Sequence, residues 1–235
     1  VTVNDNQAPV ITCPSNFTVN SAAGKCSADV PFTFNVQDIC STIDLPVSVA
    51  ISTGVTVTFS GSTLFTFTTT GTFPVGINSC TLTATDAYGN TSTCSFTVTV
   101  LDKEKPVIRL KPADVTVECA SQIPAVNISS VTATDNCGTA TITHVSDVIS
   151  NQTCANKYTI TRTYQATDGS GNTETAVQLI TVDDKTPPTI TGLTPSKRIL
   201  APPNHKMVDI TLAYTINDNC VSSPNVTVNI ASNEP

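Results

Sequence analysis

Oxygen-bearing side chains recur at three places in this 235-residue chain, each just before a proline. The stretches read "NDNQAP", "LDKEKP" and "VDDKTPP", and in each an aspartate stands four residues before a proline: Asp5, Asp102 and Asp184. Calcium, a hard cation, binds six to eight oxygens from carboxylates, amides and backbone carbonyls. One stretch supplies too few, so a calcium site would need ligands from elsewhere in the chain. A plain polar linker is the alternative, because Asp and Pro are ordinary turn and boundary residues.

Two further markers repeat with these stretches. "TATDAYGNT" (83–91) matches "QATDGSGNT" (165–173), and an Asp-x-Cys triplet occurs at 38–40, 135–137 and 218–220. Several markers in the same order at a fixed period indicate tandem domains. The two full repeats have the size of small sandwich domains.

The elements that must position these residues are strands. Segments such as "FTFNV" (32–36), "CSFTVTV" (94–100) and "YTITRTY" (158–164) alternate with a period of two, which indicates strands with one buried face. Thr and Val are abundant, and β-branched side chains suit a pleated surface. No long segment has the 3.6-residue period of a helix. The sequence therefore predicts an all-β fold of tandem immunoglobulin-like, fibronectin III-like β-sandwich domains in an extended array.

The repeats set the expected boundaries. Residues 1–8 are the tail of a preceding domain and a linker, 9–101 the first domain, 105–183 the second and 187–235 an incomplete third. The third lacks the TD-x-x-GN turn, so we expect a fragment whose third unit lacks strands unless another segment supplies them. An open strand edge invites pairing, which makes self-assembly into filaments a hypothesis.

Nine cysteines decide the expected compartment. They hold repeat-related positions in domains with small cores, which is typical of disulfides in an extracellular setting. A zinc site would need a close Cys-x2–4-Cys or Cys/His grouping, and the sequence contains none. There is no signal peptide and no run of 18 apolar residues, so we expect no membrane span in this fragment.

The strand order of a sandwich predicts three disulfides. Cys26 and Cys80 should stand where two strands begin at the same pole, and Cys119 and Cys154 hold similar places in the second domain, which predicts Cys26–Cys80 and Cys119–Cys154. The first and last strands of domain one are neighbours in such folds, which predicts Cys13–Cys94. Each bond contributes about 2–4 kcal/mol. The Asp-x-Cys cysteines either stay free or pair with chain outside this sequence: Cys40, Cys137 and Cys220.

Longer stretches resemble known surface repeats. "PVITCPSNFTV" (9–19) and "FPVGINSCTLTATDAYGNTSTCSFTVTV" (73–100) resemble the hyalin repeat, or HYR, domain. "ADVTVECASQIPAVNISSVTATDNC" (113–137) resembles a related repeat of very long bacterial surface proteins, and "PPNHKMVDITLAYTINDNC" (202–220) resembles a third type. The resemblance implies an immunoglobulin-like fold, export, adhesion and no catalysis. Repeats of the second type often carry a cysteine where this chain has Ser170, which leaves Cys137 without the partner that the resemblance implies.

Sandwich topology offers the missing calcium ligands. The B–C and F–G loops should lie at the pole that faces the preceding linker, and "NDNQAP" also resembles the linker of cadherins, which stiffen their junctions with calcium. Asp86 and Asp168 have a competing role, because Asp-x-x-Gly-Asn is a good hairpin turn. The predicted sets are Asp5, Asn6, Asp38, Asp86 and Asn90 at the first junction; Asp102, Glu104, Asp135, Asn136, Asp168 and Asn172 at the second; and Asp183, Asp184, Asp218 and Asn219 at the third.

Charge and motif content argue against other classes. The net charge of −7 disfavours nucleic acid, whose binding needs basic stripes. The two histidines, His144 and His205, stand in no Gly-x-Ser-x-Gly or His-Glu-x-x-His context, so we expect no enzyme. The predicted function is a structural module of a secreted adhesin stalk or filament, with neighbouring repeats of the same chain as partners.

An accessory carbohydrate-binding module of a secreted enzyme is the alternative function. Surface glycans usually bind exposed aromatic faces, and Tyr88 is the one aromatic residue at an obvious loop tip in this chain without Trp. Asn-x-Ser/Thr tripeptides also offer glycan acceptors where the host has the enzymes. These are Asn16, Asn90, Asn127, Asn151 and Asn225.

Overall fold

The computed structural model describes residues 5–38, 47–51, 56–59, 64–86, 88–198 and 207–229. The helices in these ranges are two single 3-10 turns, η1 (Ala120–Gln122) and η2 (Ile128–Ser130), and the rest of the regular structure is strand, which confirms the all-β prediction. No described helix is long and apolar enough to cross a bilayer.

The chain forms two compact units, each described by itself. The N-terminal unit consists of Val1–Arg109, Thr132–Ile142 and Ala166–Glu174. The C-terminal unit consists of Leu110–Val131, Thr143–Gln165 and Thr175–Pro235. The N-terminal unit therefore includes the second Asp-x-Cys loop and the second TD-x-x-GN turn.

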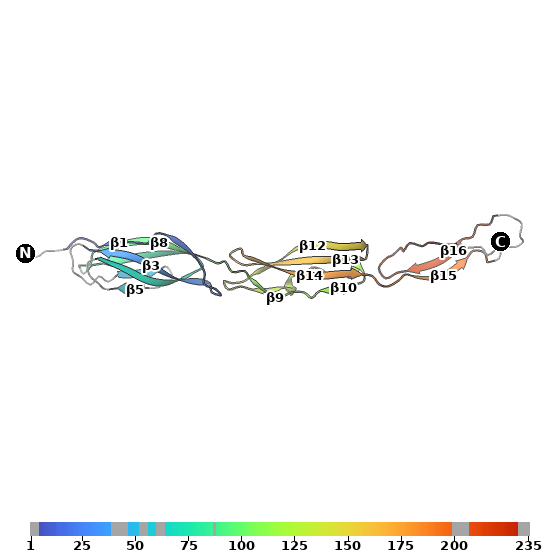
Figure 1. Ribbon diagram of the computed structural model, residues 1–235, viewed down its shortest axis with the longest axis horizontal. Helices are drawn as coiled ribbons and strands as arrows, with labels where there is room; N and C mark the ends of the chain where they lie inside the picture. The colour runs from blue at the N-terminus through green and yellow to red at the C-terminus, as the bar shows by residue number, and fades with distance from the viewer. Residues whose placement is uncertain are drawn as a thin grey trace, which may run out of the picture. The chain divides into compact units, whose positions relative to one another are not determined.

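Two sheets form a sandwich in the N-terminal unit (Figure 1). The three-stranded sheet has the order β1 (Val10–Thr12), β3 (Ser27–Gln37), β6 (Leu64–Pro74). The five-stranded sheet has the order β2 (Phe17–Asn20), β8 (Thr91–Leu101), β7 (Gly76–Thr85), β4 (Val47–Ile51), β5 (Thr56–Phe59). All of these pairs are antiparallel except β2 with β8, which is parallel.

Alternation along β3 builds the core of this sandwich. Every second residue from Ala28 to Val36 is buried, whereas the side chains between them are exposed. Their partners come from the opposite sheet and include Leu82 and Phe96, the latter with its ring centroid 5.2 Å from that of Phe32. The apolar face of each sheet is thus removed from water, which is the main favourable term in folding.

A four-stranded sheet dominates the C-terminal unit, and its long strands run side by side in Figure 1. Tyr158, Ile160, Ile180 and Val182 form its buried cluster. The short edge strand β10 pairs with β14 in parallel. The order is β10 (Val115–Val117), β14 (Thr173–Asp183), β13 (Lys157–Thr167), β12 (Thr141–Cys154).

An ion pair takes the place of apolar packing at one position on β13. Arg162, only 3% exposed, donates through Nε (2.9 Å) to Oδ1 and through Nη2 (2.8 Å) to Oδ2 of Asp147 on β12. Its Nη1 donates to the carbonyl of Pro124 at 2.8 Å. Hydrogen bonds from Arg162, followed by a contact with His144, hold the pKa of Asp147 below its ordinary value despite partial burial.

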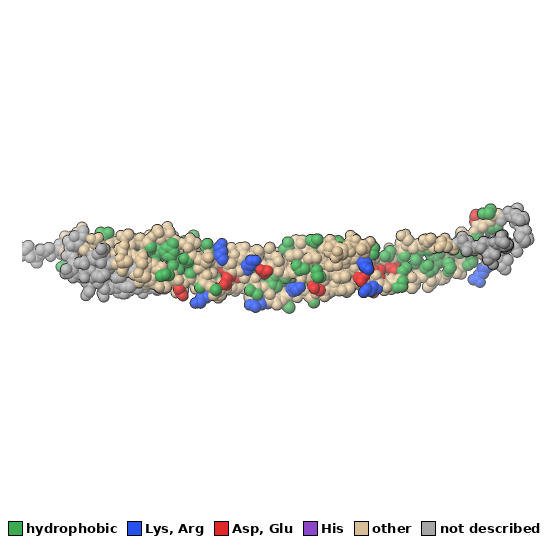
Figure 2. Space-filling view, in the orientation of Figure 1, with side chains coloured by type: hydrophobic (Ala, Val, Ile, Leu, Met, Phe, Trp, Pro, Cys, Tyr) green, Lys and Arg blue, Asp and Glu red, His purple; other side chains and the backbone are tan. Residues whose placement is uncertain are grey.

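Two small sheets complete the described strands. One pairs β9 (Val107–Leu110) with β11 (Thr132–Thr134), and the other pairs β15 (Thr189–Pro195) with β16 (Leu212–Asn217) in antiparallel fashion. Apolar side chains gather over the β15–β16 pair in Figure 2. Leu193 lies on β15 and is 62% exposed. Two strands alone are marginally stable at best. The incomplete third domain stays a prediction, and the β15–β16 pair is the sheet that it would contain.

Candidate metal centres

Three acidic groups lie in the described part of the chain, one around each linker aspartate. In each group, one ligand atom of every member lies within 4.8 Å of the others. Each combines a linker aspartate with the aspartate of an Asp-x-Cys loop, as sandwich topology predicted. The first group is Asp5, Asp38 and Asp86; the second is Asp102, Asp135 and Cys137; the third is Asp184, Asp218 and Cys220.

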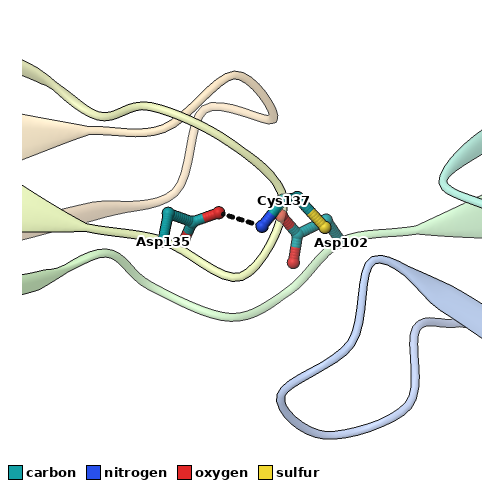
Figure 3. A group of neighbouring side chains, drawn as sticks. All are labelled: Asp102, Asp135 and Cys137. Carbon is teal, nitrogen blue, oxygen red and sulfur yellow. Dashed lines mark hydrogen bonds between the residues drawn. The ribbon is translucent and has the colours of Figure 1, made fainter.

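The second acidic group has the clearest geometry (Figure 3). Asp102 is only 4% exposed; its Oδ1 accepts from the Glu104 N–H at 3.1 Å, whereas its Oδ2 is buried without a hydrogen-bond partner. Asp135 has the same division: Oδ2 accepts from the Cys137 N–H at 2.8 Å, and Oδ1 is buried without a partner. Asn136 Oδ1 is also buried and unpaired. Each aspartate therefore holds its own turn with one oxygen and leaves the other for a ligand.

The same local turn recurs in the other groups. Asp5 Oδ1 accepts from the N–H of Gln7 at 3.0 Å, and Asp184 Oδ1 accepts from the N–H of Thr186 at 3.1 Å. Asp5 Oδ2, like Asp102 Oδ2, is buried without a partner. An aspartate side chain readily bonds the backbone two residues on, so each Asp-x-x-x-Pro stretch folds locally into a turn. That turn leaves a carboxylate oxygen available to a cation.

Asp86 and Asp168 stabilise their own Asp-x-x-Gly-Asn turns, which was the role predicted as the alternative to calcium binding. Asp86 Oδ1 accepts from the N–H groups of Tyr88 and Asn90, at 2.9 and 2.8 Å, and Oδ2 accepts from Asn90 Nδ2 at 2.7 Å. Asp168 is bonded in the same way by its turn. Burial raises the pKa of each carboxyl, but these hydrogen bonds outweigh it and hold the pKa below its ordinary value. Asp86 also belongs to the first acidic group, whereas Asp168 lies outside the second.

Asn90 and Asn172 tie these turns to the linkers. Asn90 Nδ2 donates to the backbone carbonyl of Asp5, and Asn172 Nδ2 donates to that of Asp102, both at 3.2 Å. The same contact at equivalent positions makes both asparagines positioning residues, since their amide nitrogens face the linker. Because Asn90 Nδ2 donates two hydrogen bonds and a glycan replaces one of its two hydrogens, glycosylation there would have to break at least one of them. The other four acceptor asparagines are exposed.

The remaining predicted ligands have other contacts. Glu104 Oε1 accepts from the Gly24 N–H at 2.8 Å. Asp183 pairs with Lys157 and Lys185, at 3.7 and 3.3 Å. Asn6 is exposed. Asn219 Nδ2 donates to Glu118 Oε2 at 2.9 Å. The sequence analysis missed Glu118, because nothing marks it except its place beside Cys119.

The disulfide of the first sandwich agrees with its prediction, but the next one does not. Cys13 and Cys94 are bonded, with their Cα atoms 5.8 Å apart. The predicted bond between Cys26 and Cys80 is wrong, because Cys26 bonds to Cys137. Cys80 points into the core of the sandwich with no exposed surface, whereas Cys26 lies in the exposed loop before β3.

The predicted bond between Cys119 and Cys154 is wrong too. Cys119 follows β10 and Cys154 ends β12, at opposite edges of the four-stranded sheet. Three strand spacings of about 4.8 Å separate such edges, which exceeds the Cα separation of roughly 7 Å that a disulfide spans. Cys119 bonds instead to Cys220, and Cys154 is a free, exposed thiol. Cys40 lies outside the described residues.

These bonds change the chemistry of two acidic groups. The sulfurs of Cys137 and Cys220 are disulfide-bonded and so carry no thiolate charge. The donors that remain are oxygens, which suit hard cations rather than zinc. Two unit charges within 5 Å repel by roughly 3–4 kcal/mol at an effective dielectric constant near 20, so a cation between the carboxylates would be strongly favoured.

Comparison with known proteins follows the division of the chain. Residues 4–100 match the HYR domain family, and residues 107–182 match the family described as an HYR-like domain with 4 cysteines. The chain carries HYR-family domains. The second HYR match contains three cysteines, Cys119, Cys137 and Cys154, and two of them bond outside residues 107–182.

Several relatives contain similar HYR sequence. Hyalin of Strongylocentrotus purpuratus is 34% identical over 115 residues, and hyalin of Lytechinus variegatus is 32% identical over 113; each alignment covers 46% of this chain. The mouse sushi, von Willebrand factor type A, EGF and pentraxin domain-containing protein 1 is 28% identical over 73% of the chain. The alignments cover only 9%, 21% and 4% of these three relatives, in that order. The resemblance of residues 113–137 to a repeat of bacterial surface proteins stays an expectation.

Solved structures similar to this chain include Drosophila N-cadherin EC1-4, with a TM-score of 0.39 and 12% identity over 74% of this chain and 49% of that one. The fibronectin(III)-like modules of Clostridium thermocellum CbhA align with a TM-score of 0.29 and 15% identity over 75% of this chain and 94% of that one.

Proposed function

We propose that this chain is a non-enzymatic structural part of a secreted, multi-repeat cell-surface protein, an adhesin stalk or an extracellular filament, whose junctions bind calcium. The observation that carries the proposal is the pair of buried, unpaired carboxylate oxygens, Asp102 Oδ2 and Asp135 Oδ1. Burying a carboxylate oxygen without a partner is costly. A bound cation offsets that cost and the repulsion between the two carboxylates.

Calcium fits these donors better than other common metals. The available atoms at the second group are two carboxylate oxygens and the Asn136 amide oxygen. Calcium accepts this mixture in a flexible shell that backbone carbonyls and water can complete, whereas magnesium demands a near-ideal octahedron. Zinc prefers nitrogen and thiolate sulfur, and the nearby sulfur is in a disulfide.

The mechanical role follows from what each group connects. Asp102 belongs to the linker after the first HYR match, and Asp135 belongs to a loop of the second. An ion held by both restrains the linker against the loop, and the Cys26–Cys137 bond fastens the same loop covalently. Limiting hinge freedom at each junction is the property that a stalk or filament requires.

Extracellular location and adhesion are supported by chemistry and by the relatives. Three disulfides favour an oxidising compartment, because cytosolic thiols are kept reduced. The hyalins share HYR sequence with this chain. In the carbohydrate-binding alternative, Tyr88 would be the contact residue, and its side chain is 58% exposed. No second aromatic platform accompanies it on the described turn.

Thermal melting with and without calcium tests the proposal. At a calcium concentration a hundred times the dissociation constant, one site adds about 2.7 kcal/mol of stability, so the melting temperature of the calcium-loaded chain should exceed that of the chelated chain by several degrees. The variant Asp102→Asn/Asp135→Asn should lose most of the increment that the second site contributes. The matched control, Asp29→Asn/Asp209→Asn, removes two exposed carboxylates outside the groups and should keep it. Identical melting of the unmodified chain in calcium and in chelator would contradict calcium binding.

A further inference from the structure

We propose that the Cys26–Cys137 disulfide and the cation site of the second acidic group are thermodynamically coupled, so that the bond organises the cation ligands and the bound cation protects the bond from reduction. The inference rests on the calcium binding proposed above and adds a property that neither element has alone. It concerns a path of contacts within the N-terminal unit whose two ends, Asp102 and Asp135, have ligand atoms within 4.8 Å of each other.

The path starts and ends at the two aspartates. Asp102 holds the Glu104 N–H, and Glu104 Oε1 accepts from the N–H of Gly24, two residues before Cys26. On the other side, the Cys137 N–H donates to Asp135 Oδ2 at 2.8 Å. The disulfide joins these two halves, with Cα atoms 4.7 Å apart. Figure 3 shows Asp102 beside Cys137 and Asp135 bonded to the Cys137 backbone.

A second tie runs parallel to the disulfide. Asn136 Nδ2 donates to the carbonyl of Lys25 at 3.0 Å, which turns Asn136 Oδ1 away from that loop and leaves it buried and unpaired. Two of the three free oxygens, on Asp135 and Asn136, thus stand on residues directly before Cys137. Breaking the S–S bond would release the segment that carries them, so cation affinity should fall.

The third acidic group repeats the construction in the C-terminal unit. Asp184 holds the N–H of Thr186, whose hydroxyl donates to Glu118 at 3.3 Å. Glu118 precedes Cys119, which bonds to Cys220, and the Cys220 N–H donates to Asp218 at 2.9 Å. In both the second and the third acidic group, a glutamate and a disulfide connect the two aspartates. The glutamate is Glu104 of the linker in the second group and Glu118, beside Cys119, in the third.

Coupling of this kind acts equally in both directions. If the disulfide raises cation affinity by some factor, cation binding must disfavour opening of the disulfide by the same factor. Cys13–Cys94 provides the internal control, because it packs against the core of the sandwich and belongs to no acidic group. Its reduction should follow the overall stability of the sandwich and should lack the additional, direct effect of the second cation site.

The test follows reduction of each bond in the whole chain. Dithiothreitol breaks the S–S bond and supplies two electrons and two protons to the cysteine pair, while the dithiol closes to its own disulfide. After quenching with an alkylating agent, mass spectrometry reads each pair separately. At equilibrium in mixed reduced and oxidised dithiothreitol, replacing chelator by calcium chloride should raise the reduced-to-oxidised dithiothreitol ratio at which Cys26–Cys137 is half reduced by about 5-fold or more. Any shift for Cys13–Cys94 should be smaller. In Asp102→Asn/Asp135→Asn, calcium should no longer shift the ratio for Cys26–Cys137 beyond that for Cys13–Cys94.

The outcomes separate this inference from the function beneath it. Equal half-reduction ratios for Cys26–Cys137 in calcium and chelator, in a chain whose melting temperature calcium does raise, would overturn the coupling and leave calcium binding intact. A chain whose melting temperature and half-reduction ratios are both unchanged by calcium would overturn the two proposals together. Equal shifts at Cys26–Cys137 and Cys13–Cys94 would show general stabilisation and would also overturn the coupling.

Discussion

Replacing Asp147 by Asn should lower the free energy of unfolding of the C-terminal unit by about 3 kcal/mol, because it leaves a buried charge without its counter-ion. Arg162 is 3% exposed and has two acceptors, the Asp147 carboxylate and the Pro124 carbonyl. After the substitution only the carbonyl and a neutral amide remain for a guanidinium that cannot lose its proton. Removing the other partner by Arg162→Met should lower the free energy of unfolding by only about 1–2 kcal/mol. The Asp147 side chain is 32% exposed, so water can solvate its charge.

The pair also gives stability a defined pH dependence. The pKa of Asp147 is lowered from 3.8, first by hydrogen bonds from Arg162. A carboxyl with a depressed folded-state pKa contributes stability that is fully present above its unfolded value and is lost as pH falls through the folded value. The stability gap between the unmodified protein and Asp147→Asn should therefore be constant above about pH 5 and should narrow below the ordinary value of 3.8.

Urea titration followed by tyrosine fluorescence measures these differences. The chain has no Trp, and Tyr158 and Tyr164 are buried in the C-terminal unit, where they report on this sheet. The double variant Asp147→Asn/Arg162→Met should be no less stable than Asp147→Asn alone, because it also removes the buried Arg162 charge that has lost its counter-ion. A cost below about 1 kcal/mol for Asp147→Asn, or a larger cost for Arg162→Met, would refute the reasoning from buried charge.

Two further predictions concern the sandwich and the free thiols. Leu82→Ala should lower the free energy of unfolding of the N-terminal unit by about 3 kcal/mol in a denaturant titration, because Leu82 is fully buried. On the same strand the Ile77 side chain is 78% exposed, so Ile77→Ala should change that free energy by less than about 0.5 kcal/mol. Equal effects would contradict the burial argument. Iodoacetamide should label Cys154 in the native protein at pH 8 but should label Cys80 only after unfolding, because burial raises the pKa of the Cys80 thiol to about 11. Mass spectrometry reads both labels, and similar labelling rates for the two thiols in the native protein would contradict this prediction.

The strand positions were predictable because alternation is a local property. Burial in β3 follows its apolar residues at every second position, as "FTFNV" predicted. The Asp-x-x-Gly-Asn turns were equally local, since Asp86 bonds atoms only two to four residues away. Each linker aspartate also lies near the Asp-x-Cys aspartate that the strand order of a sandwich placed beside it, although the predicted ligand sets did not include Cys137 and Cys220.

Pairings between distant residues were harder to predict. Cys26 and Cys119 were assigned partners inside their own domains by analogy with sandwich poles, yet both bond to Asp-x-Cys loops. Part of the signal was present in the repetition, since Cys137 and Cys220 recur in the same Asp-x-Cys triplet. Only the structure shows that Cys80 lies in a core and Cys154 on a surface. Glu118 had no such signal, because its role depends on contacts with residues 68 and 101 positions away.

The sequence by itself determined the period of the strands, the order of the repeats and the aspartates that flank each junction, because each depends on residues close together in the chain. Tertiary structure alone decided which carboxylate oxygens are left unpaired and which cysteines meet. Those outcomes depend on where loops a hundred residues apart come to lie: Cys119 has a bond to Cys220 across a separation of 101 residues. Local preference cannot select among such partners, since the distance between them is fixed only when the sheets have packed.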